Sequence, residues 1–349
     1  MLTTEFVEHV LTAVPGRTVG LVGDLFLDRY FDIDAALNEP SVETGLTAYQ
    51  VTGVRCYPGA LGTVLNNLAA LGVGRIHPVT VIGDDGEGYE LRKALDAMPA
   101  VVTDDIVVSA DRRTPTYSKP MLSENGAVRE LNRLDTKNRT PTPDAVIADV
   151  IARLYAAWDS FDAVIVLDQV SEAECGVITT RVRNTLEKLA QRDPNMFVLA
   201  DSRERIGKFR NVSVKPNMDE CRRAIWRTPP KRFDLSDDTF APFDLSQLVN
   251  GATFLTLGAG GIGYVPKPTD RGTNRIDIPA YPVTGPIDIC GAGDSCSAGI
   301  ACAMTAGATP EQAAAFGNLV ASITVQQIGV TGTATPEQVR ARWREVGGK

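Results

Sequence analysis

The residues best suited to chemistry form an acidic, glycine-rich segment near the C-terminal end of the chain. It runs from Asp288 through Gly291, Ala292 and Gly293 to Asp294, and a helix of small residues is expected to follow. Glycines let the backbone aim free N–H groups at one point, and a helix N-terminus adds positive potential there. Such a turn can bind a phosphoryl group, while Asp294 can accept a proton from a hydroxyl. The alternative for this segment alone is a glycine-rich turn before an ordinary helix.

A second polar pair, Asn217 and Glu220, lies three residues apart at the expected start of another helix. At this spacing both side chains share one helical face, so their oxygens can hold a hydrated Mg²⁺ ion. The same pair also fits a capping box, in which the two side chains satisfy N–H groups of the first turn. The sequence leaves both roles open, and Asn217 can serve both.

The amino-acid composition argues against several kinds of active site and binding function. The 349 residues include only His9 and His77, which argues against a histidine-rich zinc site and against a histidine charge relay. The net charge of −8 argues against general nucleic-acid binding, although a local cluster or a metal can still attract a small anion. Six cysteines without a CxxC pair indicate reduced thiols of a cytoplasmic protein. We expect neither a secretory signal nor a membrane-spanning segment.

Gly258, Gly260 and Gly263 have the spacing of a dinucleotide-binding loop and follow an expected strand at 253–257. A dinucleotide site needs a helix next, and Pro266 rules that helix out. The segment is better interpreted as a glycine-rich turn between two strands, which can pass over a nucleotide.

Alternating strands and helices predict a parallel sheet with helices on both faces. Strands are expected at 18–22, 76–82, 163–167, 196–200 and 212–215, and helices at 61–71, 86–98, 144–158, 173–192 and after Asn217. Asp24, Asp168 and Asp201 stand at strand ends. Ligands bind at the carboxyl ends of strands in such sheets, so these acids mark the expected functional edge.

Two irregular segments, at about 29–57 and 110–134, predict a smaller accessory sheet. Asn125-Gly126 is a strong signal for a hairpin within it. Four arginines of the second segment could meet a phosphorylated ligand, although a solvated face is the simpler interpretation: Arg112, Arg113, Arg129 and Arg133. The proline-rich stretch 228–243 predicts an exposed loop inserted in the same domain.

Taken in order along nearly the whole chain, these motifs resemble the ribokinase/PfkB family of carbohydrate kinases. The resemblance is carried by the Asp-Ile-Cys-Gly-Ala-Gly-Asp run ending at Asp294, by Asn217-x-x-Glu220, and by the glycine signature from Gly59 to Gly72. Val22-Gly23-Asp24, with the following residues 27–30, is similar to the heptose-phosphate kinase branch of that family.

The resemblance implies a ribokinase-like three-layer α/β/α sandwich with a small β-sheet lid, formed by one domain over residues 1–349. It implies transfer of phosphate from MgATP to a hydroxyl of a sugar or sugar phosphate, with Asp294 as general base and residues 291–293 as anion hole. The implied nucleotide and water-mediated Mg²⁺ contacts are Asn217 and Glu220, with Gly258, Gly260 and Asn318 also at the nucleotide. The implied substrate contacts are Asp24, Asp28, Gly59 and Thr63. A homodimer paired through the lids is also implied.

Two departures concern the substrate. The family usually has a second glycine where this chain has Ala60, and an asparagine where it has Thr63. A methyl group blocks close backbone approach, and a hydroxyl replaces an amide, so sugar recognition must differ or be lost. Two alternatives therefore stay open: a nucleotide-binding relative that has lost catalysis, and a nucleoside kinase of the same fold, which would need an aromatic residue to stack on the base.

Overall fold

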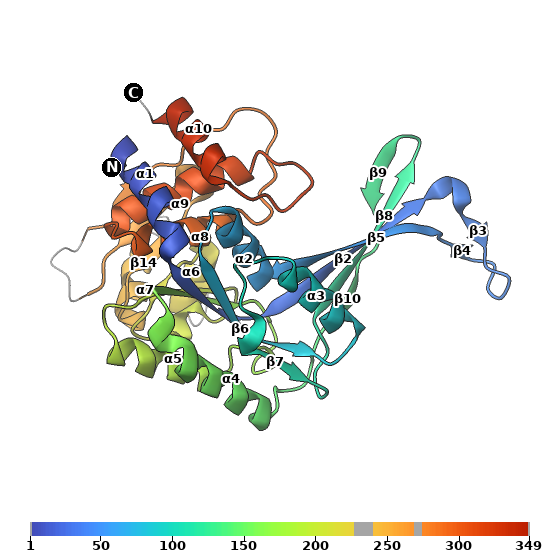
Figure 1. Cartoon of the computed structure of the whole chain (residues 1–349), viewed down its shortest axis with the longest axis horizontal. Coiled ribbons are helices and arrows are strands. Elements are labelled where there is room, and N and C mark those ends of the chain that lie inside the picture. Colours follow the sequence, from blue (N-terminus) through green and yellow to red (C-terminus); the bar gives the residue numbers. More distant parts are fainter. Residues whose placement is uncertain (1, 227–239, 269–273, 348–349) are drawn as a thin grey trace.

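The computed structural model describes residues 2–226, 240–268 and 274–347, and a nine-stranded mixed sheet forms its centre (Figure 1). In spatial order the strands are β16 (Ile276–Ile278), β15 (Ile262–Val265), β14 (Thr253–Thr256), β13 (Ser213–Val214), β12 (Phe197–Ser202), β11 (Ala163–Asp168), β1 (Thr18–Gly23), β6 (Arg75–Gly83) and β7 (Ile106–Ser109). The pairs from β7 to β14 are parallel, and β15 and β16 are antiparallel.

Helices cover both faces of this sheet because its central strands are apolar on both sides. In β1, Leu21 belongs to one buried cluster and Val22 to the other, as expected from the alternation of side chains along a strand. On the face of Leu21 lie α1 (Thr4–Ala13), α2 (Leu61–Ala70), α3 (Gly86–Asp96), α8 (Ala292–Thr305), α9 (Pro310–Thr324) and α10 (Pro336–Val346). On the face of Val22 lie α4 (Asp144–Ala157), α5 (Thr180–Arg192), α6 (Met218–Ile225) and α7 (Ala241–Val249). The predicted three-layer arrangement is confirmed.

A smaller sheet projects from this body as a long flap (Figure 1). It consists of β2 (Leu25–Asp34), β5 (Val51–Ala60), β8 (Thr116–Glu124), β9 (Ala127–Glu130) and β10 (Leu134–Thr136), and the short pair β3 (Glu39–Pro40) and β4 (Thr47–Ala48) lies at its far end. Glu124 pairs with Ala127, and the φ angles of Asn125 and Gly126 are 52° and 79°. The predicted Asn-Gly hairpin is therefore confirmed. We call this smaller sheet the lid.

Two expectations about local structure had different outcomes. The Gly258–Gly260 turn joins the antiparallel strands β14 and β15, as predicted. The helix expected over 173–192 begins only at Thr180, because Thr179 caps it and residues 169–177 form a loop held by distant side chains. Most of the loop expected at 228–243 lies outside the described residues, and α7 begins at Ala241.

The six cysteines are all free thiols, in line with the absence of a disulfide pattern in the sequence. Within the described part of the chain, no helix has the length and apolar character needed to cross a membrane.

Candidate active site

The glycine-rich segment forms a tight turn at the start of α8. Gly291 is the N-cap residue and has φ 76° and ψ 3°, a left-handed conformation that glycine adopts without strain. A Cβ atom at Gly291 would lie 2.6 Å from Cγ2 of Thr331 and 3.2 Å from Cγ2 of Thr63. The turn therefore rests on these two threonines and requires glycine at position 291.

The turn also determines which backbone N–H groups can face a ligand. The N–H of Ala292 donates to the carbonyl of Ile289 at 3.2 Å, and that of Cys290 donates to the Asp288 carboxylate at 3.0 Å. The first N–H groups of a helix have no acceptor within the helix itself. The predicted anion hole thus depends on Gly291 and Gly293 more than on Ala292.

Asp294 lies in the first turn of α8 and is partly buried. Burial and the neighbouring charge of Asp201 raise the pKa of Asp294 to about 7, although the positive charges of Lys215 and Arg203 oppose this rise. A carboxylate with a pKa near neutral pH is well matched to accept a proton from a hydroxyl and release it later.

Lys215 is a member of this site that the sequence reasoning missed. Its Nζ forms a nearly buried ion pair with Asp201 at 2.7 Å and lies 3.5 Å from the place a Cβ of Gly293 would occupy. Burial favours the neutral amine, but Asp201, Cys296 and Asp294 together outweigh it, and the pKa of Lys215 is raised. The ammonium group thus stays charged beside the predicted anion hole. Its position at a strand end, two residues before Asn217, was the available signal.

Asn217 and Glu220 form the capping box that was one of their two possible roles. The N–H of Glu220 donates to Oδ1 of Asn217 at 2.9 Å, and the N–H of Asn217 donates to Oε2 of Glu220 at 2.8 Å. Burial raises the pKa of Glu220. Both residues also line the cavity beside Asp294, so the cap presents its oxygens at the site.

We call this cavity, of about 220 Å³, the phosphate cavity. Its wall consists of Gln169, Asp201, Arg203, Lys215, Asn217, Glu220, Thr256, Gly291, Gly293 and Asp294. Gly258, Gly260 and Asn318 do not belong to that wall. The Asn318 amide donates to the carbonyls of Ile278 and Pro279, both at 3.1 Å, and fixes the end of β16.

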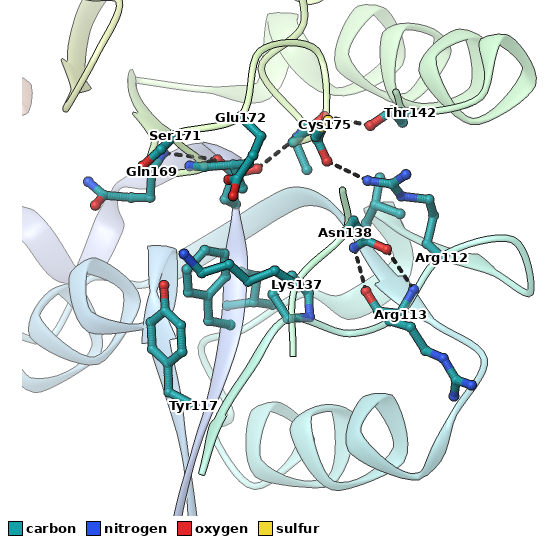
Figure 2. Close-up of a pocket in the computed structure, with 18 of the residues that line it drawn as sticks. Arg112, Arg113, Tyr117, Lys137, Asn138, Thr142, Gln169, Ser171, Glu172 and Cys175 are labelled. Carbon is teal, nitrogen blue, oxygen red and sulfur yellow. Dashed lines mark hydrogen bonds between the residues drawn. The ribbon is translucent and has the colours of Figure 1, made fainter. Parts of the chain in front are cut away.

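A second cavity, of about 170 Å³, adjoins the base of the lid (Figure 2). We call it the acceptor cavity. Its polar wall includes Asp24, Arg112, Arg113, Arg133, Lys137, Asn138, Gln169, Glu172 and Arg203, and Phe26 and Tyr117 supply aromatic surface. Gln169 and Arg203 belong to the walls of both cavities.

The cations of the acceptor cavity differ in their partners. Arg112 is buried and donates to the carbonyls of Thr140 and Cys175, while Arg133 forms a bidentate ion pair with Asp135. These two arginines therefore stabilise the folded structure through their contacts with other protein groups. Arg113, Lys137 and Arg203 have no carboxylate partner among the described residues. In Figure 2 the Lys137 side chain extends toward Tyr117, whereas Arg113 is directed away from it.

The four residues implied as substrate contacts have different surroundings. Only Asp24 lines the acceptor cavity, and its buried carboxylate accepts N–H groups from Gln169, Val170 and Val177 at 2.9, 3.1 and 2.7 Å. Burial and the charge of Asp168 raise the pKa of Asp24 to about 6.

Asp28, Gly59 and Thr63 are each packed against other residues of the protein. Asp28 is paired with Lys119 in the lid at 3.0 Å, and a Cβ at Gly59 would lie 2.5 Å from Oδ2 of Asp28. Thr63 is buried against Gly291, as described above. The register of β2 with its neighbours, which no local pattern reveals, brings Asp28 to Lys119.

The architecture is that of a ribokinase-like α/β protein with a lid. Arabidopsis thaliana ribokinase in complex with ribose and ATP has a TM-score of 0.65 to this chain at 18% identity, covering 93% of this chain and 98% of that one. Ribokinase from Cryptococcus neoformans in complex with ADP has a TM-score of 0.63 at 17% identity, covering 93% and 99%.

The chain belongs to the pfkB family of carbohydrate kinases, whose model matches residues 30–338. Bifunctional protein HldE of Bradyrhizobium diazoefficiens is 28% identical over 330 residues, covering 93% of this chain and 62% of that protein. HldE of Gluconobacter oxydans is 26% identical over 326 residues, covering 92% and 63%. The chain thus spans less than two thirds of the length of these relatives.

Proposed function

We propose that this protein transfers the γ-phosphoryl group of MgATP to a hydroxyl of a phosphorylated sugar, with Asp294 as the general base. The observation that carries the proposal is the pair of adjoining cavities. One contains Asp294, whose pKa is about 7, beside the start of α8, and the other contains three cations that have no carboxylate partner among the described residues. The two share Gln169 and Arg203. A phosphoryl donor in one cavity and a phosphoryl acceptor in the other could therefore meet at the wall that the two cavities share.

In the proposed reaction the acceptor oxygen forms a bond to the γ-phosphorus, and its proton passes to the Asp294 carboxylate. The bond from the γ-phosphorus to the oxygen bridging to the β-phosphate breaks, and ADP leaves with the electron pair. The N–H groups of Gly291 and Gly293, together with the Lys215 ammonium group, stabilise negative charge on the phosphoryl oxygens.

Asn217 and Glu220 are the proposed water-mediated contacts of Mg²⁺. One oxygen of each is engaged in the capping box, but carboxylate and amide oxygens have further lone pairs that water can reach. In the described part of the chain no three acidic, histidine or cysteine side chains form a metal-binding group of their own. This suits Mg²⁺, which is commonly held by one or two carboxylates together with water and substrate phosphates. Bound there, the ion would neutralise phosphate charge.

The charge of the acceptor cavity supports a phosphorylated acceptor. Lys137, Arg113 and Arg203 lie at the wall of one cavity without a carboxylate partner in the part of the chain that the structure describes, and the net charge of the chain is −8. Like charges gathered in this way repel one another unless an anion joins them. A phosphate on the sugar would supply that anion, which agrees with the resemblance to the heptose-phosphate kinase branch.

A nucleoside acceptor is the second candidate. Phe26 and Tyr117 line the same cavity with ring centroids 5.3 Å apart, so the aromatic surface that this alternative needs exists. One face of Tyr117 is covered by Arg133, whose guanidinium carbon lies 4.3 Å from the ring centroid. We favour the sugar phosphate because a neutral nucleoside would leave the cations unpaired.

Further proposals rest on the family resemblance. Gly258, Gly260 and Asn318 remain proposed nucleotide contacts, and open space surrounds the position a Cβ of Gly258 would take. The lid exposes Val42, Leu46, Val54 and Val128 to solvent, and the proposed homodimer would pair two lids. Light scattering of the purified protein tests the dimer.

The function is tested by following phosphorus-31 resonances while the protein acts on MgATP and a panel of sugars, sugar phosphates and nucleosides. We expect a new phosphate-ester resonance with a sugar phosphate. Asp294→Asn should abolish that resonance, whereas Asp144→Asn, which changes an aspartate in the first turn of α4 outside both cavities, should not. Binding of MgATP without transfer to any acceptor would favour the relative that has lost catalysis, and transfer only to nucleosides would favour the second candidate.

A further inference from the structure

Arg203 stands where the two cavities meet, and its backbone is fixed on both sides. Its N–H donates to the carbonyl of Asp168 at 3.3 Å, and its carbonyl accepts from the guanidinium of Arg223 at 2.8 Å. The side chain itself is exposed. A fixed backbone with an exposed side chain means that the guanidinium is presented from a defined point of the wall.

Arg205, the next arginine along the chain, has a structural role and provides a comparison for Arg203. Arg205 is buried, donates to both carboxylate oxygens of Asp168 at 3.1 and 2.6 Å, and also binds the carbonyls of Val170 and Ser171. Arg203 has no carboxylate partner among the described residues, although it comes from the same short segment. Arg205 therefore stabilises the fold through its ion pair, whereas the guanidinium of Arg203 is available to a ligand.

The electrostatic influence of Arg203 reaches both sides of the boundary. Burial raises the pKa of both Asp294, on the phosphate side, and Tyr117, at the base of the lid, and the positive charge of Arg203 opposes both rises. Gln169 shares both walls as well, but its side chain is a neutral amide. Among the described residues, Arg203 alone combines a permanent positive charge with membership of both walls.

We infer that Arg203 is a catalytic residue that binds the phosphoryl group while it passes from the nucleotide to the acceptor. This role rests on the proposed kinase function. Guanidinium N–H groups match the geometry of phosphoryl oxygens, and negative charge on those oxygens must be stabilised during transfer. Arg203 forms and breaks no covalent bond, and the proton still goes to Asp294. A residue of this kind stabilises the transition state more than either bound reactant.

The test compares three variants of Arg203 with a variant of the acceptor cavity alone. Arg203→Ala and Arg203→Gln should lower kcat by about 100-fold or more and change the KM of ATP and of the acceptor only a few-fold. Arg203→Lys should restore part of kcat, since it keeps the charge but loses the planar fork of donors. Lys137→Met should instead raise the acceptor KM and leave kcat within a few-fold. Circular dichroism and nucleotide affinity would show that each variant is folded.

A pH profile separates this role from a merely structural one. Because Arg203 favours the ionised form of Asp294, the acid limb of kcat/KM should move to higher pH in Arg203→Gln and stay in place in Lys137→Met. A kcat of Arg203→Ala within threefold of wild type, or an effect confined to the acceptor KM, would overturn the inference while the kinase function stands. A wild-type protein that binds MgATP and phosphorylates no acceptor would overturn the kinase function and this role with it.

Discussion

The Nζ of Lys215 lies 2.7 Å from Oδ2 of Asp201, and the two side chains are only 4% and 13% exposed. Both residues stand at the carboxyl ends of neighbouring strands, and they line the same cavity as Asp294. The pair thus places a positive charge beside the proposed anion hole and a negative one beside the proposed base. Burial has the largest effect on the pKa of Asp294 and raises it, and the two charges of the pair then act on that pKa in opposite directions.

Removing one member of this pair should destabilise the fold. Lys215→Met leaves Asp201 buried without its counter-charge, and we expect the free energy of unfolding to fall by about 3 kcal/mol. The double variant Lys215→Met/Asp201→Asn should regain a large part of that loss, because no uncompensated charge remains. Urea denaturation of the wild type, both single variants and the double variant measures the coupling. A single-variant loss below about 1 kcal/mol would show that the pair is not structurally important.

The activity should depend on the ionisation of Asp294. A proton acceptor must be ionised, and the raised pKa of Asp294 means that it keeps its proton until about pH 7. We therefore expect kcat/KM to rise tenfold per pH unit below about pH 7 and to level off above it. Initial rates between about pH 5.5 and 9, with thermal melting as a check on folding, give this profile. A midpoint below about pH 5 would contradict the assignment, since an ordinary exposed carboxylate titrates there.

Ala60 is held in a conformation that suits glycine. Its φ and ψ are 52° and −113°, a region in which a Cβ atom is strained. Ala60→Gly should relieve this strain and increase the free energy of unfolding by about 1 kcal/mol, after the added freedom of the unfolded chain is counted. Ala148→Gly, at an exposed position in the interior of α4, should decrease it by about the same amount. If Ala60→Gly decreased the free energy of unfolding as much as the helix control does, the backbone at Ala60 would not be strained.

Glu220→Gln separates the two roles of that residue. Glutamine can close a capping box, as Gln312 and Gln338 do in α9 and α10 of this chain. The free energy of unfolding of the variant should therefore differ from that of the wild type by less than about 0.5 kcal/mol. If Glu220 also helps to hold Mg²⁺, the Mg²⁺ concentration for half-maximal activity should rise by about tenfold or more. Titration with Mg²⁺ at saturating ATP provides the measurement. An unchanged Mg²⁺ requirement would leave Glu220 with the capping role alone.

The sequence was informative wherever the chemistry is local. Gly291 and Asp294 belong to one turn, and Asn217 and Glu220 to another, so spacing alone brought each set together. The helix of residues 61–71 and the Asn125-Gly126 hairpin followed from periodicity and turn chemistry in the same way.

Long-range contacts account for what could not be predicted. Strand register brings Asp28 to Lys119, which is ninety-one positions further along the chain, and no local pattern indicates this ion pair. Lys215 meets Asp201 because β13 lies beside β12. The late start of α5 depends on Asp24 holding the preceding loop, a contact across more than 140 positions. Such pairings depend on the packed sheet and not on neighbouring residues.

Asp24 is also the single residue between β1 of the large sheet and β2 of the lid. Its N–H donates to the carbonyl of Leu167, its carbonyl accepts from Leu61, and its carboxylate holds the loop after β11. A point fastened in this way acts as a fixed pivot. Any swing of the lid must begin beyond it, so Leu25 and Phe26 would move least and the lid tip most. The acceptor cavity would then keep its inner wall in open and closed states, and an acceptor could be recognised before the lid shuts.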